Sequence, residues 1–488
     1  MRKFQPISIS AFSMVLCLML LAPHSVSGQA VIEINSQEEF DHIDSLLEAA
    51  LHSGNKAVDV VFAQKTFYFH EDHIKLRNLA YPEASIRFRG CATVVTSGCD
   101  SATLPYQMGY VDGLRDVDPW SPVYYTDRLV EVVDTISKLC RIYAGENAFA
   151  DCQAIILTQW YYSNRYPVVR VADGYLYFVA NDMEVINSEG LCTVNYDNYY
   201  NNTFSRYKLL LPQDSSVHWC TNSCFLWMEN CSFAQLDISN ISFAGNSDGS
   251  HALIELNDVR ASTLKIHDCH FSAVHSDLLN LNATSNVTFC NNYVTDCYKE
   301  GVYSDNASFA TIVEYNYFSE CGKYLDNTFC VTCKGSDYHV AYNTFKNFGY
   351  GAVGLGLWYK TPKVYPCNGV VEHNVIFYDL DYFLNYQQHT LMDGGAIYVW
   401  TQNDNAVITH NLVHHYVGMA DNRGIFLDDG ACNVMVYENM VLHIPNSFCI
   451  DSRRVKSVET QEGSQVRKAN VGNTIENNFV DGKIRFEQ

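Results

Sequence analysis

Two adjacent acids end an apolar run in "RGIFLDDGACN", residues 423–433. Asp428 and Asp429 come directly after the run, and a glycine follows them. Asp-Gly is ordinary turn chemistry, so a turn is one interpretation. Adjacent like charges are also costly to bury, because each disfavours the ionised form of the other. A catalytic carboxylate site is therefore the second interpretation.

Strand alternation predicts which way these acids point. In "GAIYVW" it sends Tyr398 and Trp400 outward, and in "GIFLDD" it sends Asp428 outward. In "SFCIDS" it sends Asp451 outward. If these segments stack as neighbouring strands, one outer column reads Gly356, Trp400, Asp428 and Asp451. Asp428 and Asp451 would then lie about 4.8 Å apart, near the roughly 5 Å of a retaining carboxylate pair.

Asp393, in the turn of "MDGGAIYVW", is expected to project onto the same face, where two outward glycines of "AVGLG" leave a hollow. Glycosidic bond cleavage needs one acid to protonate the leaving oxygen and another to act as nucleophile or to activate water. The predicted catalytic residues are Asp393, Asp428 and Asp429. The predicted substrate-binding residues are Trp400, Tyr398, Asp451, Arg423, Arg453 and His414.

Each of these residues also has a structural interpretation. Asp393 and Asp429 fit simple turns, and Asp428 fits a solvated or calcium-binding acid. Trp400 fits a packing ladder. The two arginines fit ion pairs with nearby acids, and His414 fits a turn or the outer wall. We expect no cofactor and no metal centre, with calcium kept as an alternative.

From about residue 226 the chain repeats a short motif, in which an Asn is followed by any residue and then by an apolar one. Its anchors are Asn292, Asn316, Asn343, Asn374, Asn411, Asn439 and Asn478. "NISF" at Asn240 and "DCHF" at Cys269 carry the same pattern. Periods of about 20 to 50 residues indicate a solenoid or a propeller, and the β-rich sequence excludes helical repeats. Asparagine suits left-handed turns, and stacked asparagines form a ladder.

The N-terminal region predicts a signal and then a cap. Basic residues precede the apolar run "FSMVLCLMLLA", which is typical of a secretory signal. In the next segment, Ser36 and Glu39 form a capping box, and a helix from there is expected to plug the first coil. We therefore assign 1–28 to a signal peptide, 29–94 to the cap and first coils, 95–225 to a β-rich insertion, and 226–488 to β-helix repeats.

Composition limits the possible functions. The 488 residues are 48% hydrophobic and 18% charged, as in globular proteins. A net charge of −22 argues against nucleic-acid binding, which needs a basic stripe. The spacings Cys220-x3-Cys224 and Cys330-x2-Cys333 occur in zinc sites, but no partner pair completes either. Core thiols or local disulfides are the favoured interpretation.

The asparagine ladder, the plug helix, "LTQWYYSNRYPVVRV", and "DGGAIYVW" followed by "GIFLDDGACN" resemble right-handed parallel β-helix proteins. Gram-negative bacteria export such proteins to act on polysaccharides. The last pair of segments is similar to β-helix glycoside hydrolases of the α-fucosidase and xylanase type. The resemblance implies an all-β fold, a right-handed parallel β-helix solenoid with an N-terminal capping helix and an inserted β-rich region.

The resulting hypothesis is an exported glycoside hydrolase, periplasmic or extracellular. We expect a monomer that acts on a polysaccharide or oligosaccharide and has no membrane span. One alternative is a polysaccharide lyase on the same fold, which needs a Lys or Arg base. The other is a glycan-binding protein without catalysis, for which exposed aromatic residues would suffice. The fold alone does not choose among them, because function depends on the site.

Overall fold

A computed structural model describes most of the chain outside the first 27 residues. The described ranges are 28–69, 73–96, 106–110, 131–134, 136–143, 154–159, 162–179, 183–185, 192–194, 206–212, 224–245, 252–274, 276–297, 299–322, 328–356, 368–385, 394–400, 403, 405–417, 422–428, 430–445, 447–452 and 472–486. Nearly all of the predicted signal segment therefore lies outside the described residues.

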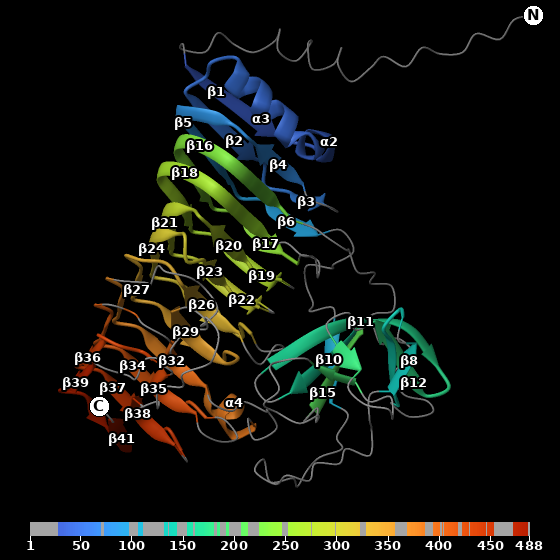
Figure 1. Cartoon of the computed structure of the whole chain (residues 1–488). Coiled ribbons are helices and arrows are strands. Elements are labelled where there is room, and N and C mark those ends of the chain that lie inside the picture. The colour runs from blue at the N-terminus through green and yellow to red at the C-terminus, as the bar shows by residue number, and fades with distance from the viewer. Residues whose placement is uncertain are drawn as a thin grey trace, which may run out of the picture.

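The chain winds into a parallel β-helix, which confirms the predicted fold (Figure 1). Sheet 1 carries the segments predicted to hold the site, and neighbouring strands in it are parallel. Its strands are β4 (Ile74–Arg77), β16 (Leu226–Ser239), β18 (Ile254–His267), β20 (Leu279–Asn282), β23 (Val302–Ser304), β26 (Phe329–Cys333), β29 (Gly351–Gly356), β32 (Gly395–Trp400), β35 (Arg423–Asp428), β38 (Phe448–Ser452) and β41 (Lys483–Phe486).

Sheet 2 shares the long strands β16 and β18 with sheet 1, and a turn separates the two sheets in later coils. Its other strands are β1 (Gln29–Ile34), β2 (Ala57–Phe62), β5 (Ala80–Gly90), β21 (Ser285–Cys290), β24 (Phe309–Glu314), β27 (His339–Ala341), β30 (Val370–Glu372), β33 (Val407–Thr409), β36 (Met435–Tyr437) and β39 (Thr474–Glu476). Sheet 3 closes each coil. It holds β3 (Thr66–Phe69), β6 (Thr93–Thr96), β17 (Ser242–Ala244), β19 (His270–Val274), β22 (Tyr293–Cys297), β25 (Tyr317–Ser319), β28 (Thr344–Lys346), β31 (Val375–Phe377), β34 (Leu412–His414), β37 (Met440–Leu442) and β40 (Phe479–Val480).

The segment between β6 and β16 forms separate antiparallel strands, which stand apart from the stack in Figure 1. They are β7 (Tyr106–Tyr110), β8 (Glu131–Asp134), β9 (Leu139–Tyr143), β10 (Ala154–Gln159), β11 (Tyr162–Ala172), β12 (Tyr175–Val179), β13 (Met183–Val185), β14 (Cys192–Val194) and β15 (Arg206–Pro212). A short helix, α4 (Leu380–Asn385), follows β31. Among the described helices, none has the length and apolarity that crossing a bilayer requires.

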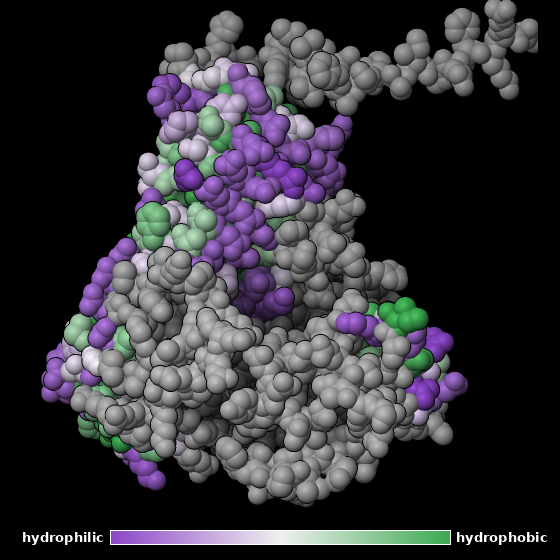
Figure 2. Space-filling view, viewed as in Figure 1, coloured by the Kyte–Doolittle hydropathy of each residue, from purple (hydrophilic) through white to green (hydrophobic). Residues whose placement is uncertain are grey.

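Inward-facing apolar side chains fill the solenoid. Phe243 of β17 stacks on Phe271 of β19 at 5.1 Å between ring centroids, and Phe318 stacks on Phe345 at the same distance. All four rings are buried. Figure 2 shows a mainly hydrophilic surface over the first coils of the viewed face. The alternation of apolar and polar residues thus directs one set inward and the other to the wall.

The predicted plug helix is present, but it is broken into two parts. Helix α2 (Gln37–Asp41) begins at Ser36, and both hydrogen bonds of the capping box with Glu39 form. Helix α3 (Ile43–His52) follows after a break at His42. Its apolar stripe is buried against the first coil, which would otherwise expose its core.

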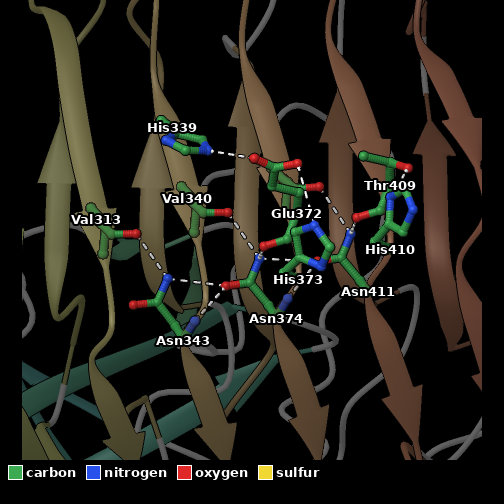
Figure 3. A network of polar contacts seen from close by, with 11 residues as sticks. Val313, His339, Val340, Asn343, Glu372, His373, Asn374, Thr409, His410 and Asn411 are labelled. Carbon is green, nitrogen blue, oxygen red and sulfur yellow. Dashed lines mark hydrogen bonds and ion pairs between the residues drawn. The ribbon is translucent and has the colours of Figure 1, made fainter.

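The asparagine ladder is confirmed from Asn292 to Asn478. Each side-chain oxygen accepts the backbone N–H of the ladder residue one coil earlier, as Asn374 Oδ1 does from Asn343 at 2.9 Å. Each side-chain amide donates back to the earlier coil, as Asn374 Nδ2 does to Val340 O at 2.9 Å and onward to Asn411 Oδ1 at 3.0 Å (Figure 3). These buried amides satisfy backbone groups that the corner would otherwise leave unpaired.

Two details of the prediction were wrong. The left-handed conformation falls on the residue before each ladder asparagine, as at His373 with φ 54°, and not on the asparagine itself. Asn240 is such a corner residue, with φ 56°. Phe243 pairs with Phe271, so the ladder position in that coil is Ile241. Cys269 does occupy the ladder, since its N–H donates to Asn292 Oδ1 at 3.0 Å.

We expect Asn374→Ala to destabilise the protein by about 2 to 4 kcal/mol, because it leaves the buried N–H of Asn343 and neighbouring amides unpaired. Chemical denaturation would measure the change. Asn35→Ala is the control, because Asn35 is exposed and outside the ladder, and it should change stability by less than about 0.5 kcal/mol. Equal effects of the two changes would show that the ladder does not stabilise the fold.

Candidate active site

The outer wall of sheet 1 brings together part of the predicted column. Gly356 pairs with Trp400, and Trp400 pairs with Asp428. These three residues therefore lie level with one another on successive coils, as predicted. The next outer column, one alternation back along the strands, holds Tyr303, Thr332, Gly354, Tyr398, Phe426 and Asp451. We call these the Asp428 column and the Tyr398 column.

The predicted place of Asp451 was wrong. Ile450 pairs with Ile425, so Asp451 pairs with Phe426 and lies in the Tyr398 column, two residues away from the level of Asp428. The predicted inward and outward directions of the side chains were correct. A shift of the strand by two residues leaves these directions unchanged, so they cannot reveal it. Asp428 and Asp451 therefore do not lie opposite each other on adjacent strands.

Asp451 is held by two arginines. Arg423 Nε donates to Asp451 Oδ2 at 2.8 Å, and Arg485 Nε donates to Oδ1 at 2.6 Å. Arg423 and Asp451 are both fully buried, and the Arg423 guanidinium also lies 4.1 Å above the ring of Phe426. Arg423 therefore pairs with a nearby acid, as its structural interpretation predicts. A fully buried ion pair of this kind is strongly destabilising to break.

Asp428 is the acid that remains beside the aromatic wall. Tyr398 Oη donates to Asp428 Oδ2 at 2.6 Å, across one coil. The side chain points outward, as predicted, but Asp428 is only 9% exposed, so it is not a freely solvated acid. A carboxylate in such a place depends on the hydrogen bonds it receives. Tyr398 thus fixes the position of one carboxylate oxygen next to Trp400.

The predicted hollow is filled beside Gly354. A side chain on Gly354 would meet the ring of Phe329 at 2.7 Å, so the ring occupies the space that the glycine leaves. Phe329 is buried and stacks on Trp400, with 5.5 Å between centroids and 26° between planes. Tyr398 packs on the edge of Trp400 at 5.2 Å. These contacts fix the plane of the Trp400 indole, which is half-buried beside Asp428.

The other predicted site residues divide into two groups. Asp393, Asp429 and Arg453 lie outside the described residues, so their proposed roles stay predictions. His414 belongs to β34 of sheet 3, not to the sheet that carries Asp428. Its Nδ1 lies 2.8 Å from Nδ1 of His415, and its ring stacks on Phe377. His414 therefore lies on the outer wall, as its structural interpretation predicts.

A second polar cluster on the same wall was missed by sequence reasoning. Asp277 and Glu300 occupy the same position in consecutive coils, just before β20 and β23, and the Glu300 N–H donates to Asp277 Oδ1 at 3.1 Å. Lys334 Nζ donates to Tyr303 Oη at 3.0 Å. Aligning "DLLNLN" with "EGVYSD" coil on coil would have shown the two acids side by side.

The pKa of Glu300 is raised well above its usual value by burial and then by the charge of Asp277, to which it is hydrogen-bonded. Lys334 acts in the opposite direction and lowers it. The upward direction dominates, since two adjacent carboxyl groups cannot both ionise without a large repulsion. The folded protein therefore keeps the proton of Glu300 to a higher pH than an ordinary glutamic acid would.

The free cysteines of the described coils are buried thiols, except for the exposed Cys91. Cys330 and Cys333 are buried and unoxidised, and burial raises the pKa of Cys333 to about 12. Cys220 lies outside the described residues, whereas Cys224 is buried. Within the described part of the chain, no group of three His, Cys, Asp or Glu residues is placed to hold a metal ion.

Comparisons with known proteins give structural neighbours only. No family model matches the chain, and no curated protein does. The chain is similar to a solved structure described as a glycoside hydrolase, at 11% identity and a TM-score of 0.46, over 93% of this chain and 96% of that chain. It is similar to XylC solved with xylose, at 9% identity and a TM-score of 0.44, over 93% and 75% of the two chains. A third neighbour is the A-module of the Azotobacter vinelandii mannuronan C-5 epimerase AlgE4, at 9% identity and a TM-score of 0.37, over 92% and 94%.

Asp451→Asn is expected to destabilise the protein by roughly 3 to 5 kcal/mol, because it leaves Arg423 charged and buried without its counter-ion. Equilibrium denaturation would measure this. Asp258→Asn is the matched control, since Asp258 forms an exposed ion pair with Arg260 in a left-handed conformation that Asn accepts. The control should cost under about 1 kcal/mol. A stable Asp451→Asn variant would contradict the structural role.

Glu300→Gln is expected to remove a pH dependence of stability. In the unfolded chain Glu300 ionises near its usual pKa of 4.5, and in the folded protein its pKa is higher. The native protein therefore loses stability as pH rises from about 4.5 through the folded pKa, because the folded state resists ionisation. Gln cannot ionise, so the melting temperature of the variant relative to wild type should increase over this range. A constant difference from pH 4 to 8 would show that Glu300 ionises freely.

Proposed function

We propose that this protein hydrolyses glycosidic bonds at the outer wall of sheet 1, with Asp428 as a catalytic carboxylate. The observation that carries the proposal is the placement of Asp428. It is a nearly buried acid, oriented by the Tyr398 hydroxyl at 2.6 Å and level with the outward Trp400 on the adjacent coil. A fixed carboxylate beside a flat apolar surface is the arrangement that sugar-ring binding and cleavage need.

Asp428 would act as nucleophile or as the base that activates water. One of its oxygens accepts from Tyr398, which orients the carboxylate without neutralising it. Asp451 is a poor second acid, because arginines hold both of its oxygens. The proton donor is therefore sought in Asp393 or Asp429, the two acids that are nearest to this wall in sequence. One of them would protonate the leaving oxygen as the bond breaks.

Trp400 would bind a sugar ring next to the acid. Its indole is half-buried, and its orientation is set by Phe329 and Tyr398. Trp400 Nε1 has no hydrogen-bond partner in the described structure, although the atom itself is buried. An N–H in that position can donate to a sugar hydroxyl beside Asp428. Tyr398 would act as a positioning residue through the carboxylate.

The alternative functions are a polysaccharide lyase and a glycan-binding protein without catalysis. For a lyase, Arg453 and Arg454 are the candidate bases, and both lie outside the described residues; Arg423 is fully buried and already neutralises a carboxylate. Export, with a periplasmic or extracellular location, is proposed from the N-terminal segment. The monomeric state is likewise proposed.

The test is incubation of the purified protein with a panel of neutral and acidic polysaccharides and oligosaccharides. Both new reducing ends and absorbance of unsaturated uronates would be measured. Hydrolysis gives reducing ends without the absorbance, and a lyase gives both. Binding without either product would support the glycan-binding alternative and contradict the proposed activity.

Asp428→Asn is expected to lower turnover about a hundred- to ten-thousand-fold on the polysaccharide that the panel identifies. Stability should change little, because the Asn oxygen can still accept from Tyr398. Asp237→Asn is the control. Asp237 is a half-buried acid in the part of β16 that belongs to sheet 2, and its change should leave turnover as in wild type. Near-normal turnover of Asp428→Asn would place the reaction elsewhere on the molecule.

A further inference from the structure

The second polar cluster spans three consecutive coils of sheet 1. Asp277 and Glu300 lie just before β20 and β23, Tyr303 lies on β23, Thr332 lies on β26, and Lys334 directly follows β26. Lys334 Nζ is 3.0 Å from Tyr303 Oη and 4.6 Å from the centre of the Tyr303 ring. The cluster thus presents an ammonium group, a phenol and a carboxyl pair on one face.

The cluster brings two acidic side chains and an ammonium group together. Burial and then the charge of Asp277 raise the pKa of Glu300, whereas the charges of Lys334 and Lys299 lower it. The hydrogen bond between the two carboxyl groups is internal to the pair. A site of this kind offers strong donors and strong acceptors together, which suits the hydroxyl groups of a sugar.

Two polar atoms in the cluster have no partner. Thr332 is only 2% exposed, and its Oγ1 forms no hydrogen bond in the described structure. It points outward in the Tyr398 column, directly after Tyr303. Asn280 Oδ1, two coils before Thr332 in the same column, is also buried without a partner. A buried polar atom without a partner costs free energy, so these atoms indicate a ligand that completes them.

The cluster lies on the same wall as Asp428. Cys333 pairs with Leu355, so Lys334 is level with Gly356, and Gly356 leads through Trp400 to Asp428. Three strand spacings separate Lys334 from Asp428, or about 14 Å along the solenoid. This span exceeds one sugar residue, so a single polysaccharide chain can reach both places.

We propose that Asp277, Glu300, Tyr303, Thr332 and Lys334 form a distal subsite for an uncharged sugar residue of a neutral polysaccharide, which is bound by its hydroxyl groups. This inference rests on the proposed function, because it assigns the polymer that Asp428 cleaves. A sugar hydroxyl both donates and accepts, so it can satisfy Thr332 Oγ1 and Asn280 Oδ1. A carboxylate group only accepts hydrogen bonds, so it could not satisfy Asn280 Oδ1 in place of a hydroxyl group.

Thr332→Val is the variant that tests the subsite. Valine has nearly the shape of threonine and removes a buried hydroxyl that has no partner, so the protein should keep or gain stability. Loss of one hydrogen bond to the ligand should weaken binding about three- to tenfold. Thr344→Val is the matched control, since Thr344 is half-buried on sheet 3, where the next coil already has Val375.

Binding would be measured by affinity electrophoresis in gels that contain one neutral or one acidic polysaccharide, with Asp428→Asn as the common background so that the polymer stays intact. We expect retardation by a neutral polysaccharide, weakened by Thr332→Val and not by Thr344→Val. In the active protein, the KM penalty of Thr332→Val should grow with the length of the substrate.

Equal retardation of the two threonine variants would overturn the subsite, as would binding to acidic polysaccharides alone. The proposed function fails separately. If Asp428-dependent cleavage occurs but Thr332→Val binds like the control, the subsite is wrong and hydrolysis stands. If Thr332-dependent binding occurs without cleavage of any glycan, the subsite stands and the hydrolase proposal is wrong.

Discussion

The asparagine ladder sets the register on which the wall depends. Each rung joins one coil to the next through a backbone N–H and a side-chain amide, for example between Asn374 and Asn411 at 3.1 and 3.0 Å. A slip of one residue would turn every side chain of a strand to the opposite face. The ladder is buried at a corner, away from sheet 1. It can therefore fix which acids face outward without taking part in binding.

Outward direction alone does not give an acid its role. Asp428 and Asp451 both point away from the core, yet both are nearly or fully buried. Two arginines compensate Asp451, which makes it part of the framework at the end of the solenoid. Asp428 receives a tyrosine hydroxyl, which orients the carboxylate. The neighbours of a carboxylate, more than its exposure, therefore limit the role that the acid can take.

Sequence patterns were sufficient for the features that repeat. The ladder asparagines, the capping box of Ser36 and Glu39, and the level of Trp400 with Asp428 followed from spacing and alternation. The position of Asp451 did not, because alternation has a period of two and cannot detect a two-residue shift. Sequence patterns could not predict that the Phe329 ring fills the space beside Gly354, because the two residues lie on different coils.

A solenoid wall repeats at the spacing of its strands, and this is also a useful property for binding a repeating polymer. Each coil adds one outward position per column about 4.8 Å further on, so polar, aromatic and acidic groups can be placed in series. From Lys334 to Asp428 the wall changes from hydrogen-bonding groups to aromatic rings to a carboxylate. With a net charge of −22, the molecule repels acidic polymers at long range. The uncharged polymer that we propose as substrate would avoid this repulsion while it lies along the coils.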